Sequence, residues 1–283
     1  MTFINFNGRI LPHDALVADL SNSAFRYGDG LFETIKYVNN RLQWASDHLR
    51  RLFNGLEELG YEIPSYFSAN YLTREIKRLC KENGLKDARV RLSVFRTCLT
   101  LFDQEDNTPG FLIEATPLYR EHPAMSITLG LFTGEIKSAG NLSRYKLSGA
   151  MLYRAAAIYA NKMNWDDILL VNQYDRICDS CIANVFFVHR DEIITPPVAE
   201  GCVDGIFRRT LLRIAPSLGF KIIEQPVPLI TADTADEIFL TNVIRGIIKV
   251  NVYHDRELST TFTERISEVI MPSILKEGEK FSM

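Results

Sequence analysis

Two amphipathic helices are predicted in the first third of the chain from the spacing of apolar residues. Between positions 47 and 59, apolar side chains recur every three or four residues, as on one face of a helix, and Gly60 follows as a stop signal. The same spacing runs through residues 66–83 and ends at Gly84. Each helix is therefore expected to bury one face against a sheet.

Short apolar runs around these helices predict the strands of that sheet. They are residues 4–12, 31–44, 88–95 and 110–116. Asn7-Gly8 is a strong hairpin signal inside the first run, and Asn39-Asn40 divides the second run into two strands. An acidic loop at residues 103–107 joins the last two. Hairpins and helices thus alternate in this part of the chain.

The pattern breaks at residues 117–123, where prolines and charges accumulate, and a domain boundary is expected there. Beyond it, helices are predicted at 147–163, 205–218 and 263–276, and strands at 126–132, 167–171, 176–179, 183–189, 192–195, 221–225 and 237–241. Strands and helices do not alternate regularly, which favours an α+β fold over a doubly wound sheet. We expect two domains of mixed sheet and helices: a smaller domain at 1–119, a linker at 120–125 and a larger domain at 126–283.

Composition narrows the class of protein. Of 283 residues, 46% are hydrophobic and 24% are charged, which is ordinary for a globular protein. The net charge of −3, without a run of lysine or arginine, argues against a nucleic-acid partner. The N-terminus does not resemble a signal peptide, and no apolar stretch approaches the ~20 residues that span a bilayer. Five cysteines without framework spacing fit reduced thiols. A cytoplasmic protein without membrane contact is expected.

Several short patterns carry little chemistry. Cys178-Asp179-Ser180-Cys181 has no second cysteine pair and no histidine at zinc spacing, so buried thiols are a better interpretation than a metal site. Gly28-Asp29-Gly30 lacks the rest of a phosphate-binding loop. The five histidines match no signature of a serine or cysteine hydrolase. No metal site is therefore predicted.

A series of segments in a fixed order is more informative. It comprises Arg26-Tyr27-Gly28-Asp29-Gly30-Leu31-Phe32-Glu33-Thr34, His48-Leu49-Arg50-Arg51-Leu52, Lys146, the run from Asp179 to Asn184, Gly205-Ile206-Phe207-Arg208 and Leu240-Thr241-Asn242-Val243. Together these segments resemble the class IV aminotransferase family, the fold type IV pyridoxal-phosphate enzymes. This family includes branched-chain and D-amino-acid aminotransferases and 4-amino-4-deoxychorismate lyase. The resemblance covers roughly residues 5–252 and implies a D-amino-acid aminotransferase-like fold whose larger domain binds the cofactor.

The resemblance implies roles for two residues in particular. Lys146 would carry pyridoxal 5'-phosphate as a Schiff base and then move the proton at the substrate α-carbon. An amine in that role must be available unprotonated. Asp179 would stand beside the pyridine nitrogen, where the family has a glutamate. The negative charge is retained, but the side chain is one methylene shorter.

The phosphate of the cofactor needs a cation and amide donors. The segment at 48–52 matches the family pattern H-L-x-R-L and implies that Arg51 is the cation. The helix opened by Gly205 suits a dianion at its N-terminus. Aminotransferases usually have threonine at the position of Phe207 and Gly-Thr at Asn242-Val243, so two hydroxyl contacts are missing here. The remaining donors implied are the backbone amides of Ile206, Phe207, Val243 and Ile244.

Departures from the aminotransferase pattern favour the lyase. They are the missing hydroxyls, the sequence at Thr241-Asn242 and the run from Cys181 to Asn184. Thr34 also matches a threonine that the lyase uses in catalysis. The reaction would release pyruvate and form 4-aminobenzoate, a precursor in folate biosynthesis. Phe32, Arg91 and Arg96 are the candidate substrate-binding residues, because guanidinium groups pair well with carboxylates.

Two alternatives stay open. One is an aminotransferase of branched-chain or D-amino acids, hence an enzyme of amino-acid metabolism. The other is a non-catalytic relative that binds the cofactor or a partner, since Asp179, Phe207 and Val243 depart from the usual residues. The resemblance also implies a homodimer.

Overall fold

The structure is a computed structural model that describes residues 2–15, 22–97, 107–118 and 126–280. The predicted linker at 120–125 and most of the predicted acidic loop at 103–107 lie outside the described residues. The chain divides into two compact units. Unit 1 comprises Met1–Arg120, Tyr145–Gly149 and Glu277–Met283, and unit 2 comprises Glu121–Arg144 and Ala150–Lys276. The short segment that contains Lys146 therefore folds with unit 1.

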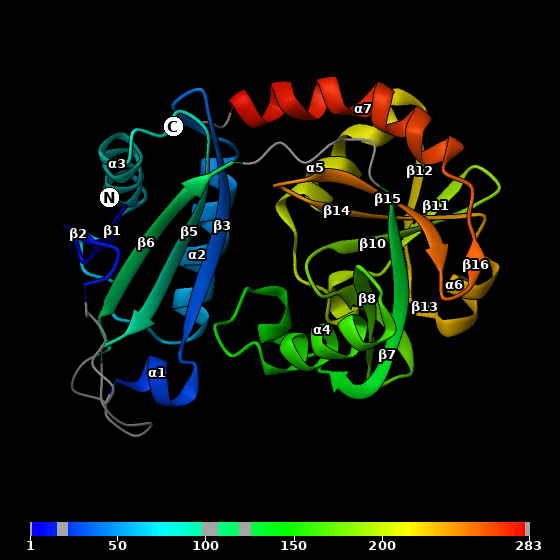
Figure 1. Ribbon diagram of the computed structural model, residues 1–283, viewed down its shortest axis with the longest axis horizontal. Coiled ribbons are helices and arrows are strands. Elements are labelled where there is room, and N and C mark those ends of the chain that lie inside the picture. Colours follow the sequence, from blue (N-terminus) through cyan, green and yellow to red (C-terminus); the bar gives the residue numbers. More distant parts are fainter. Residues whose placement is uncertain (1, 16–21, 98–106, 119–125, 281–283) are drawn as a thin grey trace. The chain divides into compact units, whose positions relative to one another are not determined.

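Unit 1 is a six-stranded antiparallel sheet with helices on one face (Figure 1). Its strands are β1 (Phe3–Phe6), β2 (Arg9–Pro12), β3 (Gly30–Val38), β4 (Arg41–Leu42), β5 (Ala88–Arg96) and β6 (Pro109–Pro117). Their order across the sheet is β2-β1-β6-β5-β3-β4. The helices are α1 (Ser23–Tyr27), α2 (Ala45–Glu58) and α3 (Ala69–Glu82). The apolar stripes of α2 and α3 pack on the sheet, as their spacing predicts.

The central strand β3 has two unlike faces because side chains alternate along a strand. Ile35 and Tyr37 point into the core beneath the helices and are almost completely buried. Phe32 and Thr34 lie on the opposite face and are half-buried. This second face of β3 carries the residues that the sequence singles out for chemistry.

Unit 2 is built on a ten-stranded mixed sheet. Its strands are β7 (Ile127–Lys137), β8 (Asp167–Asn172), β9 (Arg176–Ser180), β10 (Asn184–His189), β11 (Glu192–Thr195), β12 (Lys221–Glu224), β13 (Val227–Pro228), β14 (Glu237–Asn242), β15 (Gly246–Tyr253) and β16 (Arg256–Glu257). The order is β12-β11-β10-β14-β15-β7-β8-β9-β13, with β16 paired to β15. The helices are α4 (Met151–Met163), α5 (Ile206–Ile214), α6 (Leu229–Thr234) and α7 (Thr261–Lys280), whose last residues belong to unit 1.

Strands β10 and β14 form the centre of unit 2. Both are buried along nearly their whole length. Phe186 and Phe239 face each other in the antiparallel register and stack with their ring centres 4.9 Å apart. At one end of the same ladder, Asn184 stands opposite Thr241. The packed core thus fixes the position of two polar residues near the start of α5.

Two predicted helices differ from those in the structure. The helix predicted from residue 147 begins at Met151, because the preceding segment pairs with a strand instead: Leu147 forms a bridge with Leu31 of β3. The helix predicted at 205–218 is α-helical only to Ile214. A 3₁₀ turn, Ala215–Leu218, follows, since Pro216 has no amide hydrogen to continue the helix.

The expected α+β class with mixed sheets is confirmed. Among the residues that the structure describes, no helix combines the length and the apolar character needed to cross a membrane.

Candidate active site

Lys146 is held in unit 1 by backbone hydrogen bonds to the beginning of β3. The amide of Phe32 donates to the carbonyl oxygen of Lys146 at 2.8 Å, and the amide of Ser148 donates to that of Gly30 at 2.9 Å. The lysine side chain is half-buried, and its Nζ lies 5.0 Å from the centre of the Phe32 ring. The amine is therefore placed against a strand and an aromatic ring.

Arg91 lies against the same aromatic ring. Its Cζ is 3.8 Å from the centre of the Phe32 ring, and its Nε donates to Ser93 Oγ at 3.3 Å. In the antiparallel register, Arg91 stands directly opposite Thr34. Burial lowers the pKa of Arg91, although Glu114 opposes this effect. Thus one sheet face of unit 1 brings together an amine, a guanidinium group, an aromatic ring and a hydroxyl.

Arg96, the other arginine predicted to bind substrate, is already engaged within the protein. Its Nε donates to Asp29 at 3.0 Å, its Nη1 to Asn107 at 2.6 Å and its Nη2 to the carbonyl of Leu59 at 2.7 Å. Its guanidinium group also lies over the ring of Tyr61, at 4.2 Å. All three nitrogens hold loops of unit 1 together, so only Arg91 is carried forward as a substrate-binding candidate.

Arg51 belongs to a buried charged network on the helix-covered face of the sheet. Its Nε and Nη2 donate to the Glu33 carboxylate at 2.7 and 2.6 Å. His48, one helical turn earlier on α2, contacts the same carboxylate through Nδ1 at 2.7 Å. All three side chains are at least nine-tenths buried. Burial by itself raises the pKa of Glu33, but Arg51 and His48 outweigh it and lower the pKa to about 2.

His48 is neutral in this network. Burial lowers its pKa, and the nearby charges of Arg51 and Lys146 act in the same direction, while Glu33 opposes them. Because the ionised Glu33 only accepts hydrogen bonds, Nδ1 of His48 must carry the proton. Nε2 is then a buried acceptor that has no hydrogen-bond partner among the described residues.

Asp179 lies in unit 2 at the end of β9 and is buried in a ring of donors. Lys137 Nζ donates to its Oδ2 at 2.8 Å, and the amide of Val203 donates to the same oxygen at 3.0 Å. Asn184 Nδ2 donates to Oδ1 at 3.3 Å. The exposed fractions of Asp179 and Lys137 are only 2% and 5%. The acid predicted to face the cofactor ring is thus paired with a lysine that the sequence patterns did not indicate.

Lys137 escaped the sequence analysis because no family segment contains it. It ends a strand predicted to stop at residue 132, next to the exposed Glu135 and Ile136. A buried lysine needs a partner, but sequence spacing does not reveal that residue 179 supplies it. The only local signal is that the strand continues further than its apolar run.

The N-terminus of α5 is open. Gly205 precedes the helix, and no side chain caps it. A Cβ at Gly205 would lie 1.9 Å from Asn184 Oδ1, so a side chain there would collide with the residue that binds Asp179. The first two helical residues, Ile206 and Phe207, are buried. This end of α5 therefore combines a glycine-only position with backbone amides suited to an anion.

The turn after β14 is partly closed by its own asparagine. Asn242 Oδ1 accepts hydrogen bonds from the amides of Ile244, at 3.0 Å, and Arg245, at 2.8 Å. The sequence analysis assigned the Ile244 amide to a phosphate, but here the amide is directed at Asn242, and we leave it out of the phosphate set. Val243 is half-buried in this turn. Next to it, Thr241 Oγ1 is buried and has no hydrogen-bond partner among the described residues.

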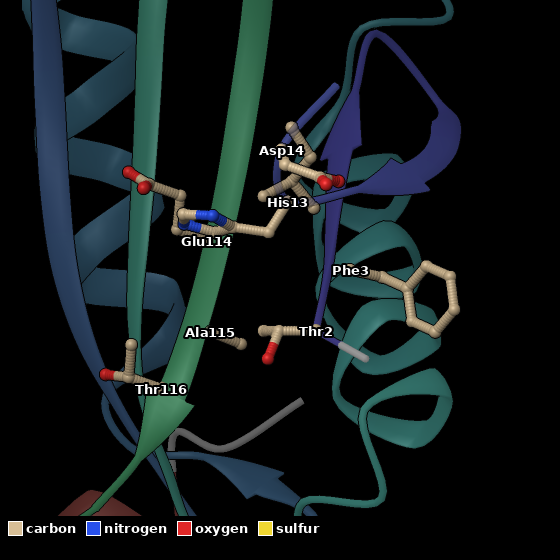
Figure 2. A pocket seen from close by; sticks show the side chains of 8 residues that line it. Thr2, Phe3, His13, Asp14, Glu114, Ala115 and Thr116 are labelled. Atoms are coloured by element: carbon tan, nitrogen blue, oxygen red, sulfur yellow. The ribbon is translucent and has the colours of Figure 1, made fainter. Parts of the chain in front are cut away.

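A separate cavity of about 440 Å³ in unit 1 does not suit an anionic cofactor. Figure 2 shows His13 and Asp14, which follow β2, and Glu114, Ala115 and Thr116 of β6 among its lining residues. Two carboxylates and no lysine or arginine line this cavity, and none of the predicted site residues does. The described residues also contain no group of three or more metal-binding side chains.

Comparison with known proteins identifies the class of enzyme. The family described as amino-transferase class IV matches residues 30–253, and the chain belongs to this family. The chain is 26% identical over 259 residues to a putative branched-chain-amino-acid aminotransferase of Methanocaldococcus jannaschii, covering 87% of this chain and 86% of the relative.

Solved structures agree on the fold. The branched-chain aminotransferase of the thermophilic archaeon Thermoproteus uzoniensis, solved with norvaline, superposes with a TM-score of 0.89 at 22% identity, covering 99% and 97% of the two chains. A putative 4-amino-4-deoxychorismate lyase from Legionella pneumophila gives a TM-score of 0.82 at 20% identity, covering 92% and 96%. Another similar branched-chain amino acid aminotransferase, from T.th., was solved with pyridoxamine 5'-phosphate and gives a TM-score of 0.89 at 21% identity, covering 100% and 98%. The protein is therefore a pyridoxal-phosphate-dependent aminotransferase or lyase with a type IV fold.

The residues present fit pyridoxal 5'-phosphate. A half-buried amine, Lys146, suits its aldehyde, and a buried acid, Asp179, suits a ring nitrogen. The open helix end at Gly205 and the unpartnered hydroxyl of Thr241 suit a phosphate. The fit differs from the family pattern at Ile244, whose amide is occupied, and at Asp179, whose charge is shared with Lys137.

Proposed function

We propose that this chain is a lyase that uses pyridoxal 5'-phosphate, attached at Lys146, to release pyruvate from an aminodeoxychorismate-like substrate and form 4-aminobenzoate. The observation that carries the proposal is the position of Thr34, opposite Arg91 and on the same sheet face as Phe32, the ring that both Arg91 and Lys146 contact. A hydroxyl in that place is available to a leaving group as well as to the amine.

The cofactor, when bound, supplies an electron-withdrawing ring that makes removal of the proton next to the substrate nitrogen feasible. Lys146 would accept that proton at Nζ. Arg91 would bind a substrate carboxylate, because its planar guanidinium group suits two parallel hydrogen bonds. Phe32 would hold the substrate ring by stacking, and Thr34 would donate a proton to the departing side of the substrate.

For the cofactor itself, we propose that Arg51 and the amides of Ile206, Phe207 and Val243 bind the phosphate and that Asp179 faces the ring nitrogen. Glu33 fixes two nitrogens of Arg51, so the orientation of the guanidinium group is set before a ligand arrives. The uncapped start of α5 and the buried hydroxyl of Thr241 support the same assignment.

Transamination of a branched-chain or D-amino acid is a second candidate. It is favoured by the names of the relatives that match the chain. It needs the same amine and carboxylate partner. The lyase is preferred because Asn242 occupies the Ile244 amide where aminotransferases have Gly-Thr, and because Thr34 supplies the hydroxyl.

The test begins with the attachment of the cofactor. Purified protein reconstituted with pyridoxal 5'-phosphate should be yellow, and borohydride should fix the cofactor to the peptide that contains Lys146. Lys146→Ala should lose this labelling, whereas the matched Lys162→Ala on exposed α4 should keep it. A colourless wild-type protein that takes up no cofactor would end the enzyme proposal and leave a non-catalytic relative.

The second assay distinguishes the two reactions. Pyruvate release from aminodeoxychorismate without any added keto acid is the result expected of the lyase. A protein that stops after one half-turnover with an amino acid, and resumes when a keto acid is added, is an aminotransferase instead. Light scattering during gel filtration tests the homodimer that the family resemblance predicts.

A further inference from the structure

The pair formed by Lys137 and Asp179 is not explained by the roles proposed so far. Lys137 is the last residue of β7, and Asp179 lies two strands further along the chain on β9. Lys137 Nζ donates to the Asp179 carboxylate at 2.8 Å and also donates to the carbonyl of Gly201. With 5% and 2% of their side chains exposed, neither group is screened by water.

The lysine carries its full charge in this position. Burial by itself lowers the pKa of Lys137, but the Asp179 carboxylate outweighs burial and raises it. The other titratable groups near Lys137 are the Tyr153 hydroxyl of α4 and the Cys178 thiol of β9, and burial raises the pKa of each to about 12. They are neutral at physiological pH, so Asp179 and Lys137 form a pair whose charges cancel.

Cancellation matters because a ring nitrogen keeps its proton only beside net negative charge. An acid with no cation at hydrogen-bonding distance supplies that charge. An aspartate that already accepts from an ammonium group and from the amide of Val203 supplies much less of it. The shorter side chain of aspartate, compared with the glutamate of the family, leaves it less able to reach past the lysine.

We propose that Lys137 is a positioning residue that neutralises Asp179, so that the ring nitrogen of the bound cofactor remains unprotonated at neutral pH. The proposal rests on the proposed function, in that the cofactor must bind with its ring nitrogen beside Asp179. It does not depend on whether the reaction is elimination or transamination. An unprotonated ring withdraws electrons less strongly, which suits expulsion of a leaving group better than a long-lived negative charge on the substrate.

The experiment measures the ring nitrogen directly. Wild-type protein, K137M and K137R are each reconstituted with pyridoxal 5'-phosphate labelled with ¹⁵N in the ring, and the ¹⁵N chemical shift is recorded at neutral pH. We expect the wild-type signal at the position of an unprotonated pyridine. In K137M it should move upfield to the position of a pyridinium, because Asp179 is released from its cation. K137R retains the cation and should give the wild-type signal.

The result for wild-type protein is decisive even if K137M fails to fold. A pyridinium signal in wild-type protein, or identical signals in wild-type protein and folded K137M, overturns the proposal. Borohydride labelling of Lys146 in the same samples separates the two failures. If wild-type protein is not labelled, the proposed function fails; if it is labelled but its ring nitrogen is protonated, only the role of Lys137 fails.

Discussion

Arg51 donates two hydrogen bonds to Glu33, from Nε at 2.7 Å and from Nη2 at 2.6 Å, across the packed boundary between α2 and β3. The Glu33 carboxylate also binds His48, so a single buried acid orients both polar residues of the helix. Glu33 therefore acts on stability and on the direction of the Arg51 guanidinium group together.

Replacing Glu33 by glutamine should destabilise the protein by roughly 3–5 kcal/mol, because Arg51 would remain buried without its counter-charge. Urea unfolding measures the change. Glu58→Gln, an exposed glutamate of the same helix, serves as the control and should change stability by less than about 0.5 kcal/mol. Equal effects of the two substitutions would show that the buried pair does not stabilise the fold.

Glu33 also predicts a loss of stability in acid. Its pKa is about 2 in the folded protein and 4.5 ordinarily, so the unfolded chain takes up the proton first as the pH falls. The stabilisation is therefore complete above pH 4.5 and is lost as the pH falls toward 2. Urea midpoints measured across this interval should decline more steeply for the wild type than for Glu33→Gln.

Asp167 contributes to the pH dependence with the opposite sign. Burial raises its pKa from 3.8 to about 6, although the amides of Ile168 and Cys181 and the Ser180 hydroxyl oppose this effect. The folded protein then holds the proton more tightly than the unfolded chain, so stability falls as the pH rises from about 4 to about 6. The difference in unfolding free energy between wild type and Asp167→Asn should shift in favour of the variant over this interval. A constant difference would contradict the raised pKa.

Asn242 should weaken the binding of a phosphate by occupying the Ile244 amide. Asn242→Gly releases that amide, and we expect the affinity for pyridoxal 5'-phosphate to rise roughly tenfold, the effect of one additional charge-assisted hydrogen bond. Equilibrium dialysis of the apo-protein measures it. Asn242→Asp keeps the oxygen acceptor and adds a negative charge, so its affinity should fall. Tighter binding by both variants would exclude the phosphate from this turn.

The two arginines of β5 should respond differently to substitution. Arg91→Met should raise the KM for a carboxylate substrate by about tenfold or more while leaving urea unfolding nearly unchanged, because Arg91 makes few bonds within the protein. Arg96→Met breaks three hydrogen bonds and should lower the unfolding free energy by roughly 2 kcal/mol or more. If Arg96→Met changed KM alone, the assignment of the two residues would be reversed.

The periodicity of the sequence predicted the elements well where burial is one-sided. The stripes of α2 and α3 and the alternation in β5 follow from local repeats, since helices and strands each bury one face. Prediction failed where a segment pairs with a distant strand. Residues before Met151 look helical, but Leu147 pairs with Leu31, far earlier in the chain, and no local pattern encodes that contact.

The sequence by itself determined the family, the α+β class and the identity of the candidate amine, because the order of short segments along a chain is a property of sequence alone. Only the tertiary structure decided how the polar residues are shared. It gave Arg96 to the loops, the Ile244 amide to Asn242 and the charge of Asp179 to Lys137. The reason is physical: a buried charge or amide must be satisfied by whatever the fold brings within about 3 Å, and residue spacing along the chain does not measure that distance.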